Sequence, residues 1–402
     1  METTPLWRNR DFMLLQAGQL LSTFGSGISG IAYPLLTLVV THSAAKTGYV
    51  GAVELAPIVL LSFPAGLAAD RFDRRALMIC ADVVGASALG VLAAAVLTHH
   101  AAFWLIVLVA FSDTTAAVFY RAGNSGALKA VVPAAQLADA SSVRMARMST
   151  VRLTAPPVGG ALFGILRGLP FVVDAVSYVF STAALLLTRA RFQEAREPGA
   201  RVRLREGMTY FWQMPFLRTT VAMIAASNVA AGGVPVALII LAHRGGLSGA
   251  AIGGFIALQG ATLLAGSLLS PLLRRVFPMR AILLSEFWTA LVYASFVAYP
   301  SVYVLAAALA IHAFWFPNTD SAIEAYSYTL IPDRLLGRAM AASNTLRAIS
   351  APLGPLLAGL LLEHASPRIA VVVLAAPAVV GAMLGTASPA LRDLPSLETG
   401  PA

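Results

Sequence analysis

Charged residues are scarce in this chain. They make up 12% of its 402 residues, and 58% are hydrophobic, whereas a typical soluble domain carries about 25% charged residues. Single cores of soluble proteins stop growing near about 250–300 residues. The composition therefore excludes an ordinary water-soluble protein and predicts one whose solvent is lipid.

Several kinds of chemistry also lack their usual residues. The single cysteine, Cys80, cannot form an internal disulfide and is interpreted as a packing residue. There is no phosphate loop of the Walker type, no Cys/His metal-ligand spacing and no nucleophile elbow in a soluble domain. The adjacent His99 and His100 are weak support for a metal. We therefore expect no enzyme activity, no metal site, no cofactor and no ATP-derived energy, which leaves the proton gradient as the energy source.

The net charge of +9 raises the question of nucleic acid. The positive charge is spread over short loops between apolar runs, however, and no basic stripe lies beside aromatic residues. We therefore expect no nucleic-acid partner; the expected partners are the bilayer and a small organic substrate, with the chain acting as a monomer.

Long apolar runs predict an all-α membrane protein with 12 transmembrane helices in two six-helix halves. A membrane helix needs about 20 mostly apolar residues. The predicted organisation is an N-terminal half (1–188), a cytoplasmic linker (189–216), and a C-terminal half with a short tail (217–402). The run after Arg8 and Arg10 lacks a signal-peptide cleavage pattern and predicts a retained first helix. The predicted spans are 12–40, 47–69, 76–98, 102–122, 140–166, 169–188, 217–242, 249–273, 280–299, 302–324, 338–363 and 367–387.

Basic residues predict the orientation. With a cytoplasmic N-terminus, 20 of the 28 Lys and Arg residues fall on the cytoplasmic side and four fall in the opposite loops. Since loops rich in Lys and Arg stay inside, both termini are expected in the cytoplasm, and the compartment is expected to be a bacterial inner membrane.

The two halves repeat. At an offset of 200, Gly66, Arg74 and Arg75 match Gly266, Arg274 and Arg275. At an offset of 199, Pro156 matches Pro355 and Gly160 matches Gly359. Parallel six-span repeats are typical of transporters that hold substrate near the midplane between the halves.

The loop between spans 2 and 3 has the sequence GLAADRFDRR, from Gly66 to Arg75. It resembles the signature loop of the major facilitator superfamily, and the resemblance extends over nearly the whole chain. It implies that Gly66 permits close helix packing. It also implies that Asp70 caps a helix start and pairs with arginines in a conformational lock formed with Arg71, Arg74 and Arg75. The alternative is ordinary positive loop charge.

Span 5 contains the run Ala155 to Gly160, APPVGG. With Ala155 in place of the usual glycine, it resembles the glycine-proline motif of the exporting branches of that superfamily. Such residues let helices bend and pack closely; a packing kink with no bearing on direction is the alternative. The predicted helix-bend residues are Pro156, Pro157, Gly159, Gly160, Pro355 and Gly359.

Two further segments, AGQLLSTFGSGIS from Ala17 and LIPDRLLGRAMA from Leu330, are similar to the drug, macrolide and siderophore exporters of the superfamily. That branch often has an aspartate after the first-span glycine. Here Gly25 is followed by Ser26, so a proton-coupling role of that aspartate has to be taken by another residue.

Ionisable residues inside predicted spans are functional candidates, because a charge in the bilayer is costly. Glu54 and Asp113 are the best candidates for carrying a proton, followed by Asp320 and Glu324; a structural role is the alternative for each. Asp82 and Asp174 fall in spans 3 and 6, which are usually peripheral in this fold, and are interpreted as structural. Arg152 is a candidate partner for Asp113 or for an anionic substrate. Together with residues of the spans that line the pathway in this fold, it gives the predicted substrate-cavity residues: Gln19, Ser22, Ser26, Tyr33, Tyr120, Arg152, Asn228, His312, Phe314, Trp315 and Asn318.

The expected function is therefore proton-driven export, by alternating access, of a small amphipathic drug-like or natural-product molecule, as in multidrug efflux and antibiotic resistance. Nutrient uptake or facilitated transport is the first alternative. A non-transporting membrane sensor on the same scaffold is the second, because fold alone does not determine function.

Overall fold

The computed structural model of the chain describes residues 6–133, 136–190, 192 and 204–394. Every regular element in these ranges is a helix. The chain divides into two compact units, which are described separately. Unit 1 comprises Met1–Pro198 with His243–Ala257, and unit 2 comprises Gly199–Ala242 with Leu258–Ala402. Most of the predicted linker lies outside the described residues.

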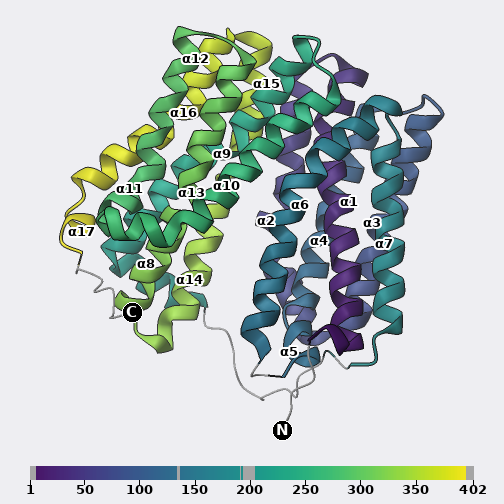
Figure 1. Cartoon of the computed structure of the whole chain (residues 1–402), viewed down its shortest axis with the longest axis horizontal. Coiled ribbons are helices and arrows are strands. Elements are labelled where there is room, and N and C mark those ends of the chain that lie inside the picture. The colour runs from purple at the N-terminus through teal and green to yellow at the C-terminus, as the bar shows by residue number, and fades with distance from the viewer. Residues whose placement is uncertain (1–5, 134–135, 191, 193–203, 395–402) are drawn as a thin grey trace. The chain divides into compact units, whose positions relative to one another are not determined.

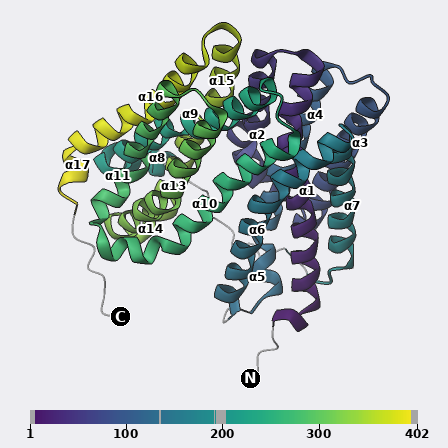
Figure 2. The same ribbon diagram turned by 45° about the horizontal axis from the view of Figure 1, so that its top comes forward.

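Unit 1 is a bundle around α1, as Figures 1 and 2 show. Helix α1 packs against α7 and α6, α2 packs against α4, and α3 packs against both α4 and α7. The short α5 lies at the same end of the bundle as the start of α1 (Figure 1). The helices are α1 (Arg10–Thr41), α2 (Ala44–Arg71), α3 (Arg74–Leu97), α4 (Phe103–Asn124), α5 (Ala127–Val131), α6 (Leu137–Ile165) and α7 (Leu169–Leu187).

Unit 2 holds the remaining elements. Helix α11 packs against α13 and α16, and α8 packs against α14. Its elements are α8 (Leu204–Gln213), α9 (Pro215–Arg244), α10 (Gly249–Val276), α11 (Met279–Thr289), η3 (Ala290–Tyr293), α12 (Ala294–Ala298), α13 (Val302–Leu330), α14 (Asp333–Ala348), α15 (Leu353–His364), α16 (Pro367–Ala387) and α17 (Pro389–Arg392). The last residues of α9 and the start of α10 belong to unit 1.

Polar residues placed between the apolar runs start the helices. The side chains of Asn9, Ser43 and Asp73 accept hydrogen bonds from backbone amides in the first turns of α1, α2 and α3. Ser301 and Ser366 do the same for α13 and α16. Such caps satisfy amides that have no partner within the helix.

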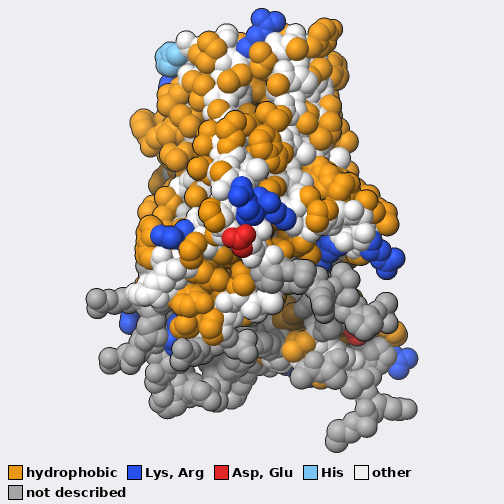
Figure 3. Space-filling model, turned by 90° about the vertical axis from the view of Figure 1, so that its left-hand side faces the viewer, with side chains coloured by type: hydrophobic (Ala, Val, Ile, Leu, Met, Phe, Trp, Pro, Cys, Tyr) orange, Lys and Arg blue, Asp and Glu red, His pale blue; other side chains and the backbone are white. Residues whose placement is uncertain are grey.

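Eleven helical segments of the described chain are long and apolar enough to cross a membrane. The predicted fifth span, α6, is 29 residues long but is more polar, since it carries Arg144, Arg147 and Arg152. The surface agrees with a lipid solvent: the face in Figure 3 is mainly hydrophobic, and Leu268 of α10 is 71% exposed. The prediction of an all-α membrane protein is confirmed.

Two predicted spans differ in detail from the structure. The span predicted over 338–363 is broken at residues 349–352, between α14 and α15, because Pro352 disfavours helix in the residue before it. The span predicted over 280–299 contains the 3-10 segment η3. In addition, α8 forms within the region predicted as a linker.

Candidate functional site

A stripe of polar residues runs along α1. Gln16, Gln19, Ser22, Ser26, Ser29 and Tyr33 recur every three or four residues, so they share one face of the helix. All except Ser26 are buried, and Ser26 is half-buried. Polar groups buried in a membrane helix are costly unless they are hydrogen-bonded, so the stripe indicates a polar interior in unit 1.

Asp113 of α4 is at the centre of this interior. Its side chain is buried, with 7% exposure. One carboxylate oxygen accepts a hydrogen bond from the Tyr33 hydroxyl of α1 at 3.1 Å, and the other accepts from the Tyr178 hydroxyl of α7 at 2.8 Å. The Ser26 hydroxyl lies 3.5 Å from that of Tyr178. Three helices therefore meet at one carboxyl group.

Asp174 of α7 belongs to the same interior. It is fully buried and accepts hydrogen bonds from the hydroxyls of Ser29 and Ser177. A methyl group added at Gly25 of α1 would collide with Asp174 and Ser177, so Gly25 permits the close approach of α1 and α7. We call Asp113, Asp174, Tyr33, Tyr178 and Ser29 the carboxylate cluster.

Glu54 of α2 is the third acid near α1. Its carboxylate lies 3.8 Å from the position of a Cβ built on Gly30, and it interacts electrostatically with Asp113. Within the described ranges no side chain donates a hydrogen bond to it. The structure thus brings together Glu54 and Asp113, the two best proton-carrier candidates, and adds Asp174.

The chemistry of the carboxylate cluster suits proton binding and transfer. A carboxyl group can bind a proton, and each tyrosine or serine hydroxyl can both donate and accept a hydrogen bond. No cation pairs with Asp113 in the part of the chain that the structure describes: Arg152, the predicted partner, is exposed. The neighbours of Asp113 are tyrosines rather than an arginine.

Three predicted cavity residues of unit 1 have partners inside the unit. Gln19 donates a hydrogen bond to the side chain of Asn124 at 2.6 Å. Tyr120 accepts one from Ser181 at 3.3 Å, and Tyr33 is bonded to Asp113. These side chains connect helices within the bundle.

Unit 2 has its own buried polar groups. Glu286 of α11 is 4% exposed and accepts a hydrogen bond from Ser227 of α9 at 2.8 Å. His312 of α13 is also buried. Its ring lies 5.5 Å from the ring of Tyr293, and its Nδ1 lies 3.4 Å from the Thr289 hydroxyl.

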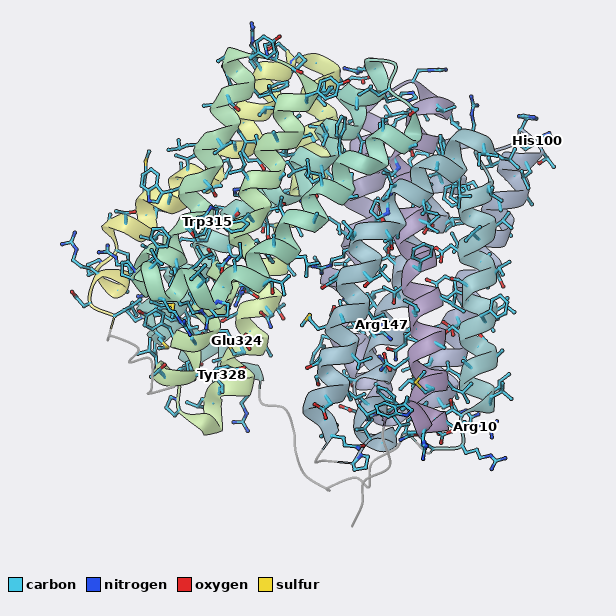
Figure 4. All side chains as sticks on the ribbon, viewed as in Figure 1. Arg10, His100, Arg147, Trp315, Glu324 and Tyr328 are labelled. Carbon is cyan, nitrogen blue, oxygen red and sulfur yellow. The ribbon has the colours of Figure 1, made fainter. Side chains whose placement is uncertain are left out.

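Asp320 and Glu324 of α13 have different surroundings from those of Asp113. Asp320 is 54% exposed and forms an ion pair of 3.3 Å with Arg347, which is 14% exposed. Glu324 is exposed and accepts a hydrogen bond from Tyr328, one turn further along the helix (Figure 4). Neither carboxylate is buried in a polar interior like that of unit 1.

The remaining predicted cavity residues of unit 2 mainly connect helices. Asn228 donates to the Arg347 carbonyl at 2.8 Å, and Asn318 donates to the Gly266 carbonyl at 3.1 Å. Phe314 and Trp315 pack edge to face at 5.3 Å. Trp315 is labelled in Figure 4.

The signature loop corrects one expectation. Asp70 lies in the last turn of α2, whose helical backbone continues to Arg71, so Asp70 cannot cap the next helix. The residue that caps α3 is Asp73, which accepts from the Ala76 amide at 2.8 Å. Arg75 donates to the Leu186 carbonyl at the end of α7 at 2.6 Å.

The loop glycine also differs from the prediction. A methyl group added at Gly66 would meet no heavy atom within 4 Å, so Gly66 makes no close packing contact in this structure. At its repeat partner Gly266 the same methyl group would strike the Phe314 carbonyl. Arg74 packs against the turn at Gly126, where an added methyl group would strike its guanidinium.

The proline-glycine motif of α6 is a close-packing site within unit 1. The helix continues without a break through Pro156 and Pro157. Added methyl groups would strike the backbone of Ile28 at Gly159 and that of Gly249 at Gly160. In unit 2, the matching Pro355 and Gly359 are buried in α15.

Comparison with known proteins identifies the family of this chain. A family model described as transmembrane secretion effector, of the major facilitator superfamily, matches residues 2–400. The chain belongs to this family. It is therefore a multi-pass membrane transporter and not an enzyme.

Its relatives include efflux proteins. The chain is 26% identical over 410 residues to the multidrug efflux pump Tap of Mycobacterium bovis, covering 96% of this chain and 95% of that protein. It is 23% identical over 190 residues to macrolide efflux protein A of Streptococcus pyogenes, covering 47% of each. It is 28% identical over 225 residues to an uncharacterised transporter, YfiS of Bacillus subtilis, and spans about half of its length, 52%.

Solved structures share the fold. A bacterial homologue of the iron transporter ferroportin aligns with a TM-score of 0.75 and 17% identity, over 95% of this chain and 98% of that one. The nucleoside transporter NupG aligns with a TM-score of 0.73 and 13% identity, over 92% and 97%. At these identities the likeness concerns the fold alone.

Proposed function

We propose that this transporter is a proton-coupled exporter of small amphipathic organic molecules in a bacterial inner membrane, with both termini in the cytoplasm. The observation that carries the proposal is the carboxylate cluster, in which a buried Asp113 is held by two tyrosine hydroxyls, with Asp174 beside it. Glu54 lies close to this cluster. The efflux function named for the relatives supports export. The excess of arginine at one end of the predicted spans supports the orientation.

The cluster suggests how a proton is coupled to movement. A proton entering from outside binds Asp113 and neutralises it. The Tyr33 and Tyr178 hydroxyls each donate to one oxygen of the carboxylate. The hydroxyl at the protonated oxygen then has to reorient, because that oxygen becomes a donor. Since α1, α4 and α7 meet at this group, its protonation changes the bonds that join them. If the proton and the substrate bind preferentially to different conformations of the transporter, entry of a proton drives export of a substrate molecule.

The proposal is tested in inverted membrane vesicles that contain the protein, with ethidium as the probe. We expect ethidium to accumulate when a proton gradient, acid inside, is imposed, and to leave when that gradient is collapsed. Vesicles without the protein give the background. Accumulation that is unchanged after the gradient is collapsed would contradict proton coupling. Movement of ethidium out of the vesicles while the gradient is present would contradict export.

Glu54→Gln provides a second test, of the acid that lies close to the carboxylate cluster. The change keeps the shape of the side chain and removes its ability to bind a proton. We expect slower proton-driven accumulation at an unchanged protein level in the membrane. The matched control is Asp139→Asn, an exposed acid in the first turn of α6, which should transport like the unaltered protein.

A further inference from the structure

Asp82 of α3 is a buried acid that the cluster described above does not include. Its side chain has 0% exposure, and neither carboxylate oxygen has a hydrogen-bond partner among the described residues. A fully buried carboxylate that no cation pairs with is costly inside a membrane protein and marks a functional position. Packing alone does not require an acid at this position.

The groups around Asp82 are hydroxyls. Ser181 and Thr182 of α7 approach its carboxylate, and Tyr120 of α4 interacts with it electrostatically. Ser181 donates a hydrogen bond to Tyr120 at 3.3 Å. In the described part of the chain no Lys, Arg or His forms an ion pair with Asp82. Tyr120 also interacts electrostatically with Arg147 of α6.

Helix α7 connects Asp82 to the carboxylate cluster. Ser181 follows Tyr178 by three residues, about 4.5 Å along a helix, and both are buried. Tyr178 donates to Asp113 at 2.8 Å, and its ring packs against Gly85, one turn from Asp82 on α3. One face of α7 therefore presents polar groups from Asp174 through Tyr178 to Ser181.

A cavity lies at the end of α4, where Asn124 is one of its lining residues. It has a volume of about 190 Å³, and its lining includes Gln16, Gln19, Asn124 and Arg144. Asn124 follows Tyr120 by one turn of α4. Arg147 donates to the Gln16 side chain at 2.8 Å, and Figure 4 places it in the half of unit 1 nearer to Arg10 than to His100. This cavity has several polar side chains in its lining and is large enough to hold water.

We propose that Asp82 is a second proton-binding site, through which protons pass from the carboxylate cluster to the cavity lined by Gln16, Gln19 and Asn124. In the exchange proposed above, on which this role rests, Asp113 loses the proton, an Asp82 oxygen gains it through the intervening hydroxyls, and water in the cavity then takes it. No electron moves and no other reactant is needed. Asp82 is thus the exit for protons on the cytoplasmic side.

The first test detects proton binding without transport. Dicyclohexylcarbodiimide modifies protonated carboxyl groups in apolar surroundings, and mass spectrometry of peptides from the full-length protein identifies the modified residue. We expect modification of Asp82 at a rate that falls as the pH is raised from about 6 to about 9, since only the protonated form reacts. Absence of modification, or a rate independent of pH, would overturn the proposal. This test needs no variant and so does not depend on a mutant folding.

The second test uses Asp82→Asn, with Asp139→Asn as the matched control, in inverted vesicles with ethidium. We expect proton-driven accumulation to fall by at least about tenfold, which is less than the about hundredfold or greater effect of a direct proton-transfer group, because Asp113 can still bind a proton. The remaining rate should no longer depend on the pH of the medium, which bathes the cytoplasmic face. A rate and pH profile equal to those of the control would overturn the exit role.

The two proposals fail in different ways. If the unaltered protein accumulates ethidium independently of the proton gradient, the proposal of proton-coupled export is wrong, and so is the exit role of Asp82. Proton binding by Asp82 is then still tested by the rate of its modification. If the unaltered protein is proton-driven and Asp82→Asn matches the control, only the exit role fails.

Discussion

Unit 1 and unit 2 contain different buried chemistry at matching positions. Asp113 of α4 and His312 of α13 are 199 residues apart, which is the offset that relates Pro156 to Pro355. Asp113 accepts hydrogen bonds from two tyrosines. His312 instead contacts Thr289 and the ring of Tyr293. The repeat thus keeps the position of a buried polar residue and changes which group stands there.

The other buried acids extend this difference. In unit 1, Asp174 accepts hydrogen bonds from two serine hydroxyls, and the hydroxyls of Ser181 and Thr182 lie near Asp82. In unit 2, Glu286 has one hydroxyl partner, Ser227, and Asp320 pairs with Arg347. A duplicated scaffold can therefore assign proton chemistry to one unit, which is how we interpret the cluster in unit 1.

The largest expected effect is on transport by Asp113→Asn. Asparagine keeps the shape of the side chain but cannot carry a proton, so we expect proton-driven ethidium accumulation to fall by at least about a hundredfold. The same exchange at the matching position, His312→Asn, should lower it far less. Equal losses in the two variants would contradict the assignment of proton chemistry to unit 1.

The second prediction compares the repeated glycines. Gly266→Ala places a methyl group against the Phe314 carbonyl, so we expect the free energy of unfolding to fall by about 1–3 kcal/mol. Gly66→Ala places its methyl group in open space and should not lower stability. Thermal unfolding in detergent measures both. A destabilised Gly66→Ala, with Gly266→Ala unaffected, would show that the packing of these helices is assigned wrongly.

The third prediction compares two buried tyrosines. Tyr178→Phe removes a hydrogen bond to Asp113, and we expect a loss of about 1–2 kcal/mol in the free energy of unfolding. Tyr293→Phe removes a buried hydroxyl that has no partner among the described residues, so its stability should be unchanged or slightly higher. Denaturation of both purified variants tests this difference, and a reversed order would be inconsistent with the hydrogen bonding described.

The smallest expected effect is that of Asp320→Asn. The ion pair with Arg347 is partly exposed on the aspartate side, and such pairs contribute about 0–1 kcal/mol. We expect a change of unfolding free energy within that range, measured by the same denaturation. A loss as large as that of Tyr178→Phe would mean that the pair is as important as the hydrogen bonds of unit 1.

Much of the fold could be predicted from the sequence, because apolar runs of membrane length and constant offsets between landmarks carry a strong signal. The polar stripe on α1 also follows from the spacing of Gln16 to Tyr33. The cap of α3 could not be assigned to Asp70 or Asp73 from the sequence, because the assignment depends on the residue at which α2 ends.

The full cluster could not be predicted, because spacing identifies the face of a helix but not the helix that this face meets. Asp174 and Asp82 lie on spans that are usually peripheral, and their surroundings depend on the packing of α7 against both α1 and α3. The small residue Gly25, opposite Asp174, was the signal in the sequence that could have suggested this contact.

Proton movement driven by substrate tests the central claim most directly. Proteoliposomes that contain the purified protein and a pH-sensitive dye are given an ethidium gradient and no initial pH difference. We predict that protons move opposite to ethidium through the unaltered protein and that Asp113→Asn abolishes this proton flux. Ethidium movement without proton flux, or a normal proton flux through Asp113→Asn, would contradict proton exchange through unit 1.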